Sequence, residues 1–543
     1  MAAILLLCLL VFFRDALLSR FVLLYGDSYD GGIEVSLLNH WYNVFVHGAR
    51  WNLTGWFAPQ DDTIGYNDTD IIPGIPFTIA RLAGADPFLA AFVSHVAMKV
   101  VGFAGMYALL RRGLAIRTPL ALAGAAIFAT SNASLLHMHH AQLLTVGLVP
   151  WLMLAAIGTV RAAIADAPPA LWRNGLAFAI LFGVAALNAF YMVWFFALFA
   201  MLFVPIGLAV ADAATRTMLW RAARRHGWRI AGVAAATIVA LVPFLLVYLP
   251  KLAESGGHDF LRDVMRYLPI RDTFVNVGPG NLVWGQILPN ARFSPGEHRF
   301  GFPLGLLVGT LIAIRWSARH QRAAPLMLAI ALTTTVLALL AIRWSIMGSL
   351  WWLVYEVVPG VRSVRVITRL LLFLLIPMIA LLMMALQRWR LPPAVLAIAI
   401  AFLLLEEVQL AAPLALDRPA LLRMLRDIGP PPADCDTFFV VSARPADAPL
   451  QAEADQIGTA WGASRPNDLL GLYRHNVDAM LLASYYDRPT INGVSTFNPP
   501  DWKFDHPEAA DYTARVRRYA KVHHLGQLCG LDRRRTPRWF ALR

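Results

Sequence analysis

The sequence predicts an α-helical polytopic membrane protein with about eleven transmembrane helices and a small α/β domain outside the membrane at its C-terminal end. Composition is the first observation behind this prediction. Hydrophobic residues make up 58% of the chain and charged residues only 15%, whereas soluble domains carry roughly 25% charged residues. The second observation is a repeated pattern of apolar runs near the ~20 residues that a helix needs to cross a bilayer.

The net charge of +13 comes almost entirely from arginine, because the chain contains few lysines. The arginines fall in loops between apolar runs, so nucleic-acid binding is a poor explanation of the charge and we expect no nucleic-acid partner. The bias towards alanine and arginine suggests a GC-rich bacterial genome. No charged segment precedes the first apolar run and no small-residue cleavage site follows it, so a cleaved signal peptide is not expected.

Eleven apolar runs are candidate membrane spans. They cover residues 2–24, 88–110, 118–136, 141–160, 174–189, 190–210, 230–249, 300–316, 323–342, 367–387 and 391–411. The first run contains Arg14 and Asp15, so either the span is shortened at its cytoplasmic end or residues 14–25 lie along the membrane interface. The pair 174–189 and 190–210 could break elsewhere around Asn188.

Alternate loops between the apolar runs hold groups of arginines, which predicts the orientation. The rich loops contain Arg111, Arg112 and Arg117; Arg161 and Arg173; Arg216, Arg221, Arg224, Arg225 and Arg229; Arg315, Arg319 and Arg322; and Arg388 and Arg390. By the positive-inside rule these loops are cytoplasmic. The first loop 25–87, the loop 137–140, the outer loop 250–299, the loop 343–366 and the tail then face out. We expect a bacterial inner-membrane protein with a cytoplasmic N-terminus and a periplasmic C-terminal domain.

The chain changes character after residue 411, which divides it into a transmembrane domain at 1–411 and a small periplasmic α/β domain at 412–543. The apolar runs shorten to strand length, as in Thr437–Ala443. Strand-like and helix-like segments alternate in this region, in the order FFVVSA, a helix-like DAMLLASYY, RPTINGV and a final RWFAL. Cys435 and Cys529 lie near the two ends of this domain. They could pair in an oxidising periplasm or be buried free thiols, because spacing alone fixes no geometry.

Asp27 and Asp30 follow the first apolar run, within GDSYDGG. Glycines let a backbone approach a ligand closely. A carboxylate at this position could take the proton from an attacking hydroxyl as a general base. The alternative is that both aspartates cap a helix over 33–47.

Four more aspartates occur further along the first loop, at Asp61, Asp62, Asp68 and Asp70. Carboxylate oxygens can bind a divalent cation such as Mg or Mn, and Asp27, Asp30 and Asp70 are the candidate ligands. A solvated acidic turn is the alternative, because DDTIGYNDTD has no specific ligand spacing. Trp41, Trp51 and Trp56 could stack on sugar faces or anchor the loop at the interface.

The sequence HMHH, followed by glutamine, stands at the outer end between two spans. His137, His139, His140 and Gln142 are polar residues at membrane depth, which usually face a cavity. We expect them to line a cavity and to contact substrate or phosphate. A metal site is an alternative because imidazole is a common ligand, although adjacent histidines cannot easily all face one ion. Interface residues without a role are the third possibility.

Arg362, Arg365 and Arg369 are spaced i, i+3, i+7, which places them on one face if the segment is a helix. They stand on the outer side, where few arginines are expected, so we expect a phosphate or diphosphate partner. Snorkelling to lipid head groups is the alternative. Further cations could complete a cationic wall: Arg262, Arg266, Arg271, Arg292, His298 and Arg299.

Taken together, these motifs resemble the GT-C superfamily of membrane glycosyltransferases, and the chain looks most similar to its less characterised bacterial members. The resemblance covers nearly the whole chain and rests on several short motifs. These are the GD-x-x-D start at Asp27 and Asp30, the element Gly55–Pro59, the segment Leu136–Gln142, PGVRSVRVITR and RPTINGVSTFNPP. None of the motifs is diagnostic alone.

The resemblance implies an inverting sugar transfer from a polyprenyl-phosphate-linked donor to a lipid, polysaccharide or protein acceptor outside the membrane. It gives the role of general base to Asp27 or Asp30, of which Asp27 is preferred because it directly follows Gly26, and the phosphate to the arginine group. Some members of the superfamily need a metal and others do not. The alternatives are a transporter or flippase for a lipid-linked or anionic solute, a polysaccharide polymerase or ligase, and a non-catalytic anchoring protein.

Overall fold

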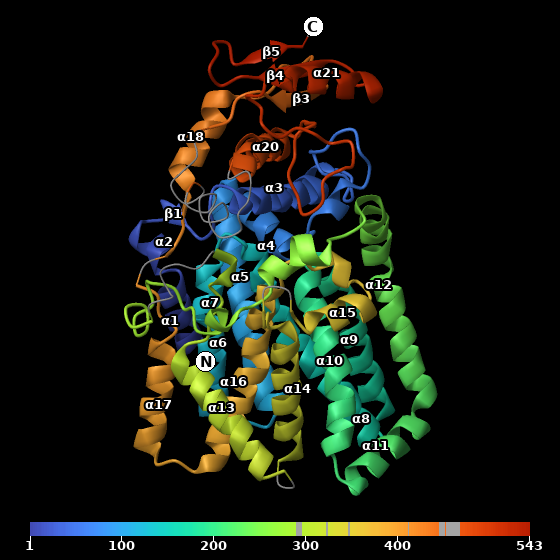
Figure 1. Cartoon of the computed structure of the whole chain (residues 1–543), viewed down its shortest axis with the longest axis vertical. Helices are drawn as coiled ribbons and strands as arrows, with labels where there is room; N and C mark the ends of the chain where they lie inside the picture. The colour runs from blue at the N-terminus through green and yellow to red at the C-terminus, as the bar shows by residue number, and fades with distance from the viewer. Residues whose placement is uncertain are drawn as a thin grey trace.

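A computed structural model of the chain describes residues 1–288, 296–321, 324–345, 348–410, 412–444, 451 and 467–542. Long helices form a bundle, and a smaller unit built from the C-terminal residues lies across one end of it (Figure 1). The arginine-rich helix α11 (Ala213–Arg225) lies at the opposite end of the bundle. The bundle therefore separates the arginine-rich loops from the first loop and the C-terminal unit.

Seven helical segments among the described residues are long and apolar enough to cross a membrane. They are α5 with a π-helical turn (Pro87–Gly113), α6 with α7 (Thr118–Leu136), η4 with α8 (Ala141–Ile164), α9 (Pro168–Asn188), α10 (Phe190–Val210), α12 (Gly227–Ser255) and η11 with α16 (Ile367–Trp389). The other four predicted spans are also helical but shorter: α1 (Ala2–Phe12), α13 (Leu304–Arg319), α14 (Pro325–Ala341) and α17 (Pro393–Leu405). The predicted count of eleven spans is not confirmed.

The first predicted span, over residues 2–24, is wrong as a single helix. Helix α1 ends at Phe12, and the short helix α2 (Arg14–Leu18) follows. The break falls at the charged pair, where Arg14 Nε lies 3.5 Å from an Asp15 oxygen and Asp15 Oδ2 accepts a hydrogen bond from the backbone of Ala412. The chain then forms β1 (Leu23–Leu24), which pairs antiparallel with β2 (Leu416–Asp417).

The predicted boundary between the spans 174–189 and 190–210 is within one residue of the observed break, since α9 ends at Asn188 and α10 begins at Phe190. The break gives the first loop a set of hydrogen bonds. The Asn188 carbonyl accepts from the backbone of Thr69 and Asp70, and its side-chain oxygen accepts from the backbone of Ile72. A buried asparagine thus holds the start of α4 (Ile71–Leu82) against the gap between two helices.

The first loop contains the helix α3 (Asp30–Tyr42), which continues as a π-helical turn (Asn43–His47). The helix predicted over 33–47 is therefore present and begins three residues earlier. A Cβ atom on Gly32 would lie 2.7 Å from Val477, a residue of α20 (Asn467–Tyr486). The glycine is needed for α20 to pack closely on α3, and not only for approach to a ligand.

The C-terminal unit contains a three-stranded sheet. Strand β3 (Thr437–Val440) pairs parallel with β4 (Leu528–Leu531), which pairs antiparallel with β5 (Trp539–Ala541). Helices α18 (Arg418–Ile428), α20 and α21 (Tyr512–Val522) accompany the sheet. The predicted helix and terminal strand are confirmed, and a disulfide joins Cys435 to Cys529.

Two sequence elements that looked unrelated pair with each other. The backbone of Phe57 donates to the carbonyl of Asn492, Ala58 donates to Thr490, and Thr490 donates back to Gly55. The Gly55–Pro59 element of the first loop and the INGV segment of the tail therefore form a ribbon-like junction. This junction fixes the C-terminal unit onto the first loop.

Candidate functional site

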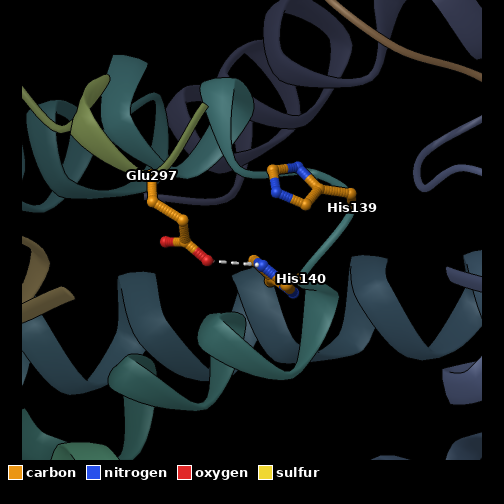
Figure 2. A group of neighbouring side chains, drawn as sticks. All are labelled: His139, His140 and Glu297. Carbon is orange, nitrogen blue, oxygen red and sulfur yellow. Dashed lines mark hydrogen bonds and ion pairs between the residues drawn. The ribbon is translucent and has the colours of Figure 1, made fainter. Parts of the chain in front are cut away.

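Four side chains from distant parts of the chain meet where the first loop lies over the helical bundle. Asp30 begins α3, His140 precedes η4 (Ala141–Leu148), Glu297 lies in η9 (Gly296–His298), and Arg369 ends η11. An oxygen of Asp30 lies 3.4 Å from His140 Nδ1, His140 Nε2 lies 2.8 Å from Glu297 Oε1, and Arg369 Nη2 lies 2.8 Å from that oxygen. We call these four residues the polar cluster; Figure 2 shows the contact between His140 and Glu297.

Glu297 carries the negative charge at the centre of the polar cluster. Burial raises the pKa of this carboxyl, but the Arg369 guanidinium and then His140 outweigh burial and hold the pKa well below its ordinary value. Glu297 is therefore ionised, and it neutralises a buried arginine. Its second oxygen, Oε2, is buried and has no hydrogen-bond partner among the described residues.

His140 lies between two carboxylates but is not a stable cation. Burial lowers its pKa, and the positive charge of Arg369 lowers it further. A neutral ring that donates from Nε2 to Glu297 turns the lone pair of Nδ1 towards Asp30; this tautomer is inferred from the contacts. The Nδ1 lone pair and the Asp30 oxygen, 3.4 Å apart, can share one proton.

His137 and His139 are buried beside His140. The His137 ring stacks on Phe300 with a centroid distance of 3.3 Å, and the rings of His139 and His140 are 4.1 Å apart. Burial lowers the pKa of His137 to about 3 and that of His139 well below its ordinary value, so both rings are neutral. His137 Nε2 and His139 Nδ1 have no partner among the described residues, as expected of groups that line a ligand site.

Arg365 and Arg369 supply positive charge next to the carboxylates. The hydroxyl of Tyr191 accepts from the backbone of Arg365, and the ring of Tyr191 lies 5.3 Å from the Arg369 guanidinium. The guanidinium of Arg365 lies over the ring of Tyr267, at 5.4 Å. Nε of each arginine is buried without a partner in the described part of the chain. Two guanidinium N–H groups are thus available to an anion.

The prediction that Arg362, Arg365 and Arg369 share one helix face is wrong. The segment forms two separate 3-10 turns, η10 (Val361–Ser363) and η11, and helix α16 begins only at Leu370. Val364 and Val366, whose backbones are not helical, interrupt the segment between the two turns. Arg362 is exposed and lies over Tyr355, whereas Arg365 and Arg369 face the polar cluster.

Asp27 takes the capping role that the sequence left open. Its Oδ1 accepts hydrogen bonds from the backbone of Tyr29, at 3.0 Å, and of Gly31, at 2.8 Å. Two backbone N–H groups at the start of α3 are satisfied in this way. Asp30, the first residue of the helix, lies beside His140.

The other acidic residues of the first loop do not form one site. Asp61 is exposed and lies 3.8 Å from Arg50. Asp70 is buried, and burial followed by the charges of Glu34 and Asp68 raises its pKa well above the ordinary value. Burial raises the pKa of Asp68 to about 6, although Arg369 acts in the opposite direction. The prediction of a solvated acidic turn holds for Asp61 but not for Asp68 or Asp70.

The predicted Mg or Mn ligands do not come together. In the described residues, the group with metal-ligand spacing is His139, His140 and Glu297, whose ligand atoms lie within 4.8 Å of one another. Two imidazoles and one carboxylate suit Zn better than Mg, which prefers oxygen ligands. The Glu297 oxygen nearest His140 is already paired with Arg369, so the residues fit a hard oxygen-bound cation poorly.

The remaining candidates have no ion pair with the polar cluster among the contacts of the described residues. Trp56 is 1% exposed in the segment that pairs with the tail, so its ring offers no face to a sugar, and that prediction is wrong. Arg262 is exposed and pairs with Asp263, while Arg266 lies over Tyr267, 5.0 Å away. Gln142 is half-buried, and its carbonyl accepts from Thr145. Arg292 lies outside the described residues.

Sequence reasoning missed Glu297, Tyr191 and Tyr267. The sequence did contain a signal for Glu297. It is the only acidic residue between Asp272 and Glu356, and it directly precedes His298, which was a candidate for the cationic wall. The two tyrosines gave no comparable signal, because their role depends on the arginines that pack against them.

Comparison with known proteins gives a weak likeness. No family model matches the chain, and no curated protein sequence matches it. Among solved structures it is similar to arabinofuranosyltransferase AftD from Mycobacteria, seen by single-particle cryo-EM, with 18% sequence identity and a TM-score of 0.40. The match covers 78% of this chain and 30% of that one. A likeness of this strength decides neither family nor activity.

Proposed function

We propose that the protein is a membrane glycosyltransferase that moves a sugar, with inversion, from a polyprenyl-phosphate-linked donor to an acceptor outside the membrane. The polar cluster is the observation that supports this most. It places the Asp30 carboxylate beside the neutral His140 imidazole, and Glu297 joins that imidazole to the Arg369 guanidinium, at the end of a bundle of apolar helices. A lipid-linked sugar phosphate needs a base for the acceptor and a cation for the leaving phosphate.

Asp30 is the general base in this proposal. The acceptor hydroxyl loses its proton to the Asp30 carboxylate as the acceptor oxygen forms a bond to the anomeric carbon. The bond from that carbon to the phosphate oxygen breaks, and the electron pair leaves with the lipid phosphate. His140 Nδ1, 3.4 Å from Asp30, can share the proton that Asp30 receives. Asp27, preferred on sequence alone, is not chosen because its Oδ1 is occupied by two backbone N–H groups.

Arg365 and Arg369 bind the departing phosphate in this proposal. Their unpartnered Nε–H groups can donate to phosphate oxygens, and guanidinium is well suited to this geometry. The interaction strengthens as negative charge develops on the leaving oxygen, which is how such donors lower a barrier. Glu297 holds Arg369 in place through the 2.8 Å ion pair and keeps the net charge of the empty site small.

The orientation of the chain is part of the proposal. The arginine-rich α11 lies at one end of the bundle, and α3, which begins with Asp30, lies at the other (Figure 1). With the arginine-rich loops in the cytoplasm, the first loop and the C-terminal unit face the periplasm of a bacterial inner membrane. The sugar, the acceptor molecule and any metal requirement are not part of it.

Replacement of the two aspartates tests the proposal. A deletion strain is complemented with wild type, Asp30→Asn or Asp27→Asn, and surface glycans and glycolipids are compared by mass spectrometry. We expect Asp30→Asn to leave the sugar-sized mass missing and Asp27→Asn to restore it, because asparagine can still accept the two backbone hydrogen bonds. Equal membrane levels and thermal midpoints of the purified variants are the control.

Full restoration by Asp30→Asn would remove Asp30 as the base. If Asp27→Asn alone failed, the base would be Asp27. Restoration by both variants and by Arg369→Met would contradict catalysis at this cluster and favour transport of a lipid-linked solute.

A further inference from the structure

A cavity of about 920 Å³ is not used by the proposed reaction. It is lined by residues 255–262, at and after the end of α12, and by residues of 348–362, which include α15 (Trp351–Val357). The cavity wall combines the aromatic side chains of Phe260, Trp352 and Tyr355 with four charged ones: Asp259, Glu356, Arg262 and Arg362.

The charges of the cavity wall balance. The carboxylates Asp259 and Glu356 offset the guanidiniums Arg262 and Arg362, and Arg262 is further paired with Asp263 through two hydrogen bonds of 3.2 Å. The fifth polar side chain, His258, is neutral near pH 7, because burial and then Arg365 lower its pKa to about 4. A wall without net charge does not favour a phosphate, which needs a surplus of positive groups.

Aromatic surface is available beside these charges. Trp352 is 51% exposed, and Tyr355 lies 5.6 Å from the Arg362 guanidinium. Carboxylate and guanidinium groups can each hydrogen-bond two neighbouring hydroxyls, and a flat ring packs against the C–H face of a sugar. Gly256, in a left-handed conformation, has no atom within 4 Å of its would-be Cβ, so a ligand can approach the backbone there.

Hydrogen bonds link the cavity wall to the segment that leads into the polar cluster. The backbone of His258 donates to the carbonyl of Arg362, at 2.8 Å, and the Tyr355 hydroxyl donates to the carbonyl of His258, at 2.7 Å. The charge of Arg365, three residues after Arg362, lowers the pKa of both His258 and His140. Phe497 of the C-terminal unit stacks on the His258 ring at 4.5 Å, so the same wall also meets the tail.

We propose that this cavity binds a neutral carbohydrate chain, which is the acceptor of the transferred sugar. That the ligand is the acceptor rests on the proposed function. That the ligand is a neutral carbohydrate rests on the balanced charges and on the exposed Trp352. The bound chain extends from the cavity, past His258, to bring its terminal hydroxyl to Asp30. This reassigns Arg262 and Arg362 from phosphate binding to hydroxyl binding.

Glycan binding by the full-length protein tests the proposal independently of catalysis. The probe is an array of defined oligosaccharides of arabinose, galactose, mannose, glucose and rhamnose, incubated with wild type purified in detergent. We expect retention on at least one oligosaccharide, weakened about ten-fold by Trp352→Ala through loss of ring stacking. Trp344→Ala is the matched control, since Trp344 is 56% exposed on a neighbouring segment and does not line the cavity.

The variant Asp30→Asn separates this inference from the proposed function. We expect it to bind the same oligosaccharide within two-fold of wild type, even though transfer is lost. Glu356→Gln reports on hydroxyl binding without loss of volume and should weaken retention several-fold. No retention across the array, equal retention by Trp352→Ala, or displacement of the oligosaccharide by inorganic pyrophosphate would each overturn the proposal. Capture of polyprenyl phosphate by the cavity in place of any oligosaccharide would overturn it as well.

Discussion

Two of the groups of buried polar side chains in the described part of the chain differ in how completely they are hydrogen-bonded. In the C-terminal unit, Asn492 donates to Asn476, at 2.7 Å, and to the Tyr512 hydroxyl, at 3.1 Å, and accepts from the backbone of Val440. Tyr512 in turn donates to the Val440 carbonyl. We call Asn476, Asn492 and Tyr512 the asparagine network. In and beside the polar cluster, by contrast, buried atoms of Glu297, Arg369 and other side chains have no partner among the described residues.

The difference indicates what each group is for. A buried polar atom without a partner costs about 1–3 kcal/mol, so a protein rarely retains several together for stability alone. The asparagine network is complete and ties strand β3 to α20 and α21. The polar cluster is incomplete and is completed, in our proposal, by the sugar phosphate. Disruption of the first should damage the fold and spare chemistry, and most changes to the second should do the reverse.

Arg369→Met should have the largest effect and is the exception that tests this contrast. It leaves the buried Glu297 charge without its closest cation, which costs about 3–5 kcal/mol of unfolding free energy, and it removes a phosphate ligand. We expect transfer to fall below detection. The double variant Arg369→Met/Glu297→Gln should recover most of the stability, measured by denaturation in detergent, and none of the transfer. Recovery of transfer would contradict a role for Arg369 in catalysis.

Asn492→Leu should damage the fold and spare the chemistry. It leaves the backbone N–H of Val440, the side-chain oxygen of Asn476 and the Tyr512 hydroxyl each short of a bond, at a cost of about 2–4 kcal/mol. Transfer per folded molecule should stay within two-fold of wild type. Tyr512→Phe alone and together with Asn492→Leu completes a double-mutant cycle, in which coupling of at least about 0.5 kcal/mol is expected. Simple additivity would show that these residues are not one network.

Asp68→Asn should change the pH dependence of stability. The folded pKa of Asp68 is raised from 3.8 to about 6, so the folded state binds more protons between these values and the protein loses stability as pH rises from 4 to 6. The loss amounts to about 1–3 kcal/mol. Asparagine should flatten this part of the profile, measured as thermal midpoints in detergent from pH 4 to 7. An unchanged slope would mean that another carboxyl, such as Asp70, carries the effect.

Asp61→Ala should have the smallest effect, although it lies in the same loop. Asp61 is exposed, and its nearest arginine is 3.8 Å away, so the pair contributes at most about 1 kcal/mol. Transfer and thermal midpoint should both match wild type. A loss of transfer above ten-fold would show that the exposed end of the loop contacts substrate, and would weaken the division between capped, buried and exposed acids.

Much of the bundle could be predicted from the sequence because apolar runs of the right length have few alternatives to helices. The break at Asn188 and the helix after Asp30 were predicted for the same local reason. The interruption of the first span at Arg14 and Asp15 was anticipated only as an alternative, because its stabilising contact is with Ala412, almost four hundred residues away in sequence.

The candidate site was predicted less completely. His140 and Arg369 could be singled out because polar residues at membrane depth are unusual, but their partner Glu297 comes from a third segment whose position only the fold determines. The spacing of Arg362, Arg365 and Arg369 suggested one helix, but the segment forms two separate 3-10 turns, with Arg362 in the first and Arg369 in the second. Trp56 was a candidate for stacking on a sugar because nothing in the first loop shows that the residues around it pair with residues 490–492.

The packing of α20 on α3 also imposes an order in time. Asn39 donates to the carbonyl of Ser484, 445 residues later in the chain, and helix α3 carries Asp30 at its first turn. At ribosomal speeds of ~5–20 residues per second, the loop that holds the base leaves the ribosome about 20–90 s before its covering helix is made. During that interval α3 lacks the helix that packs on it. In our proposal, a chain that ended before α20 would therefore hold Asp30 on a helix without its packing partner.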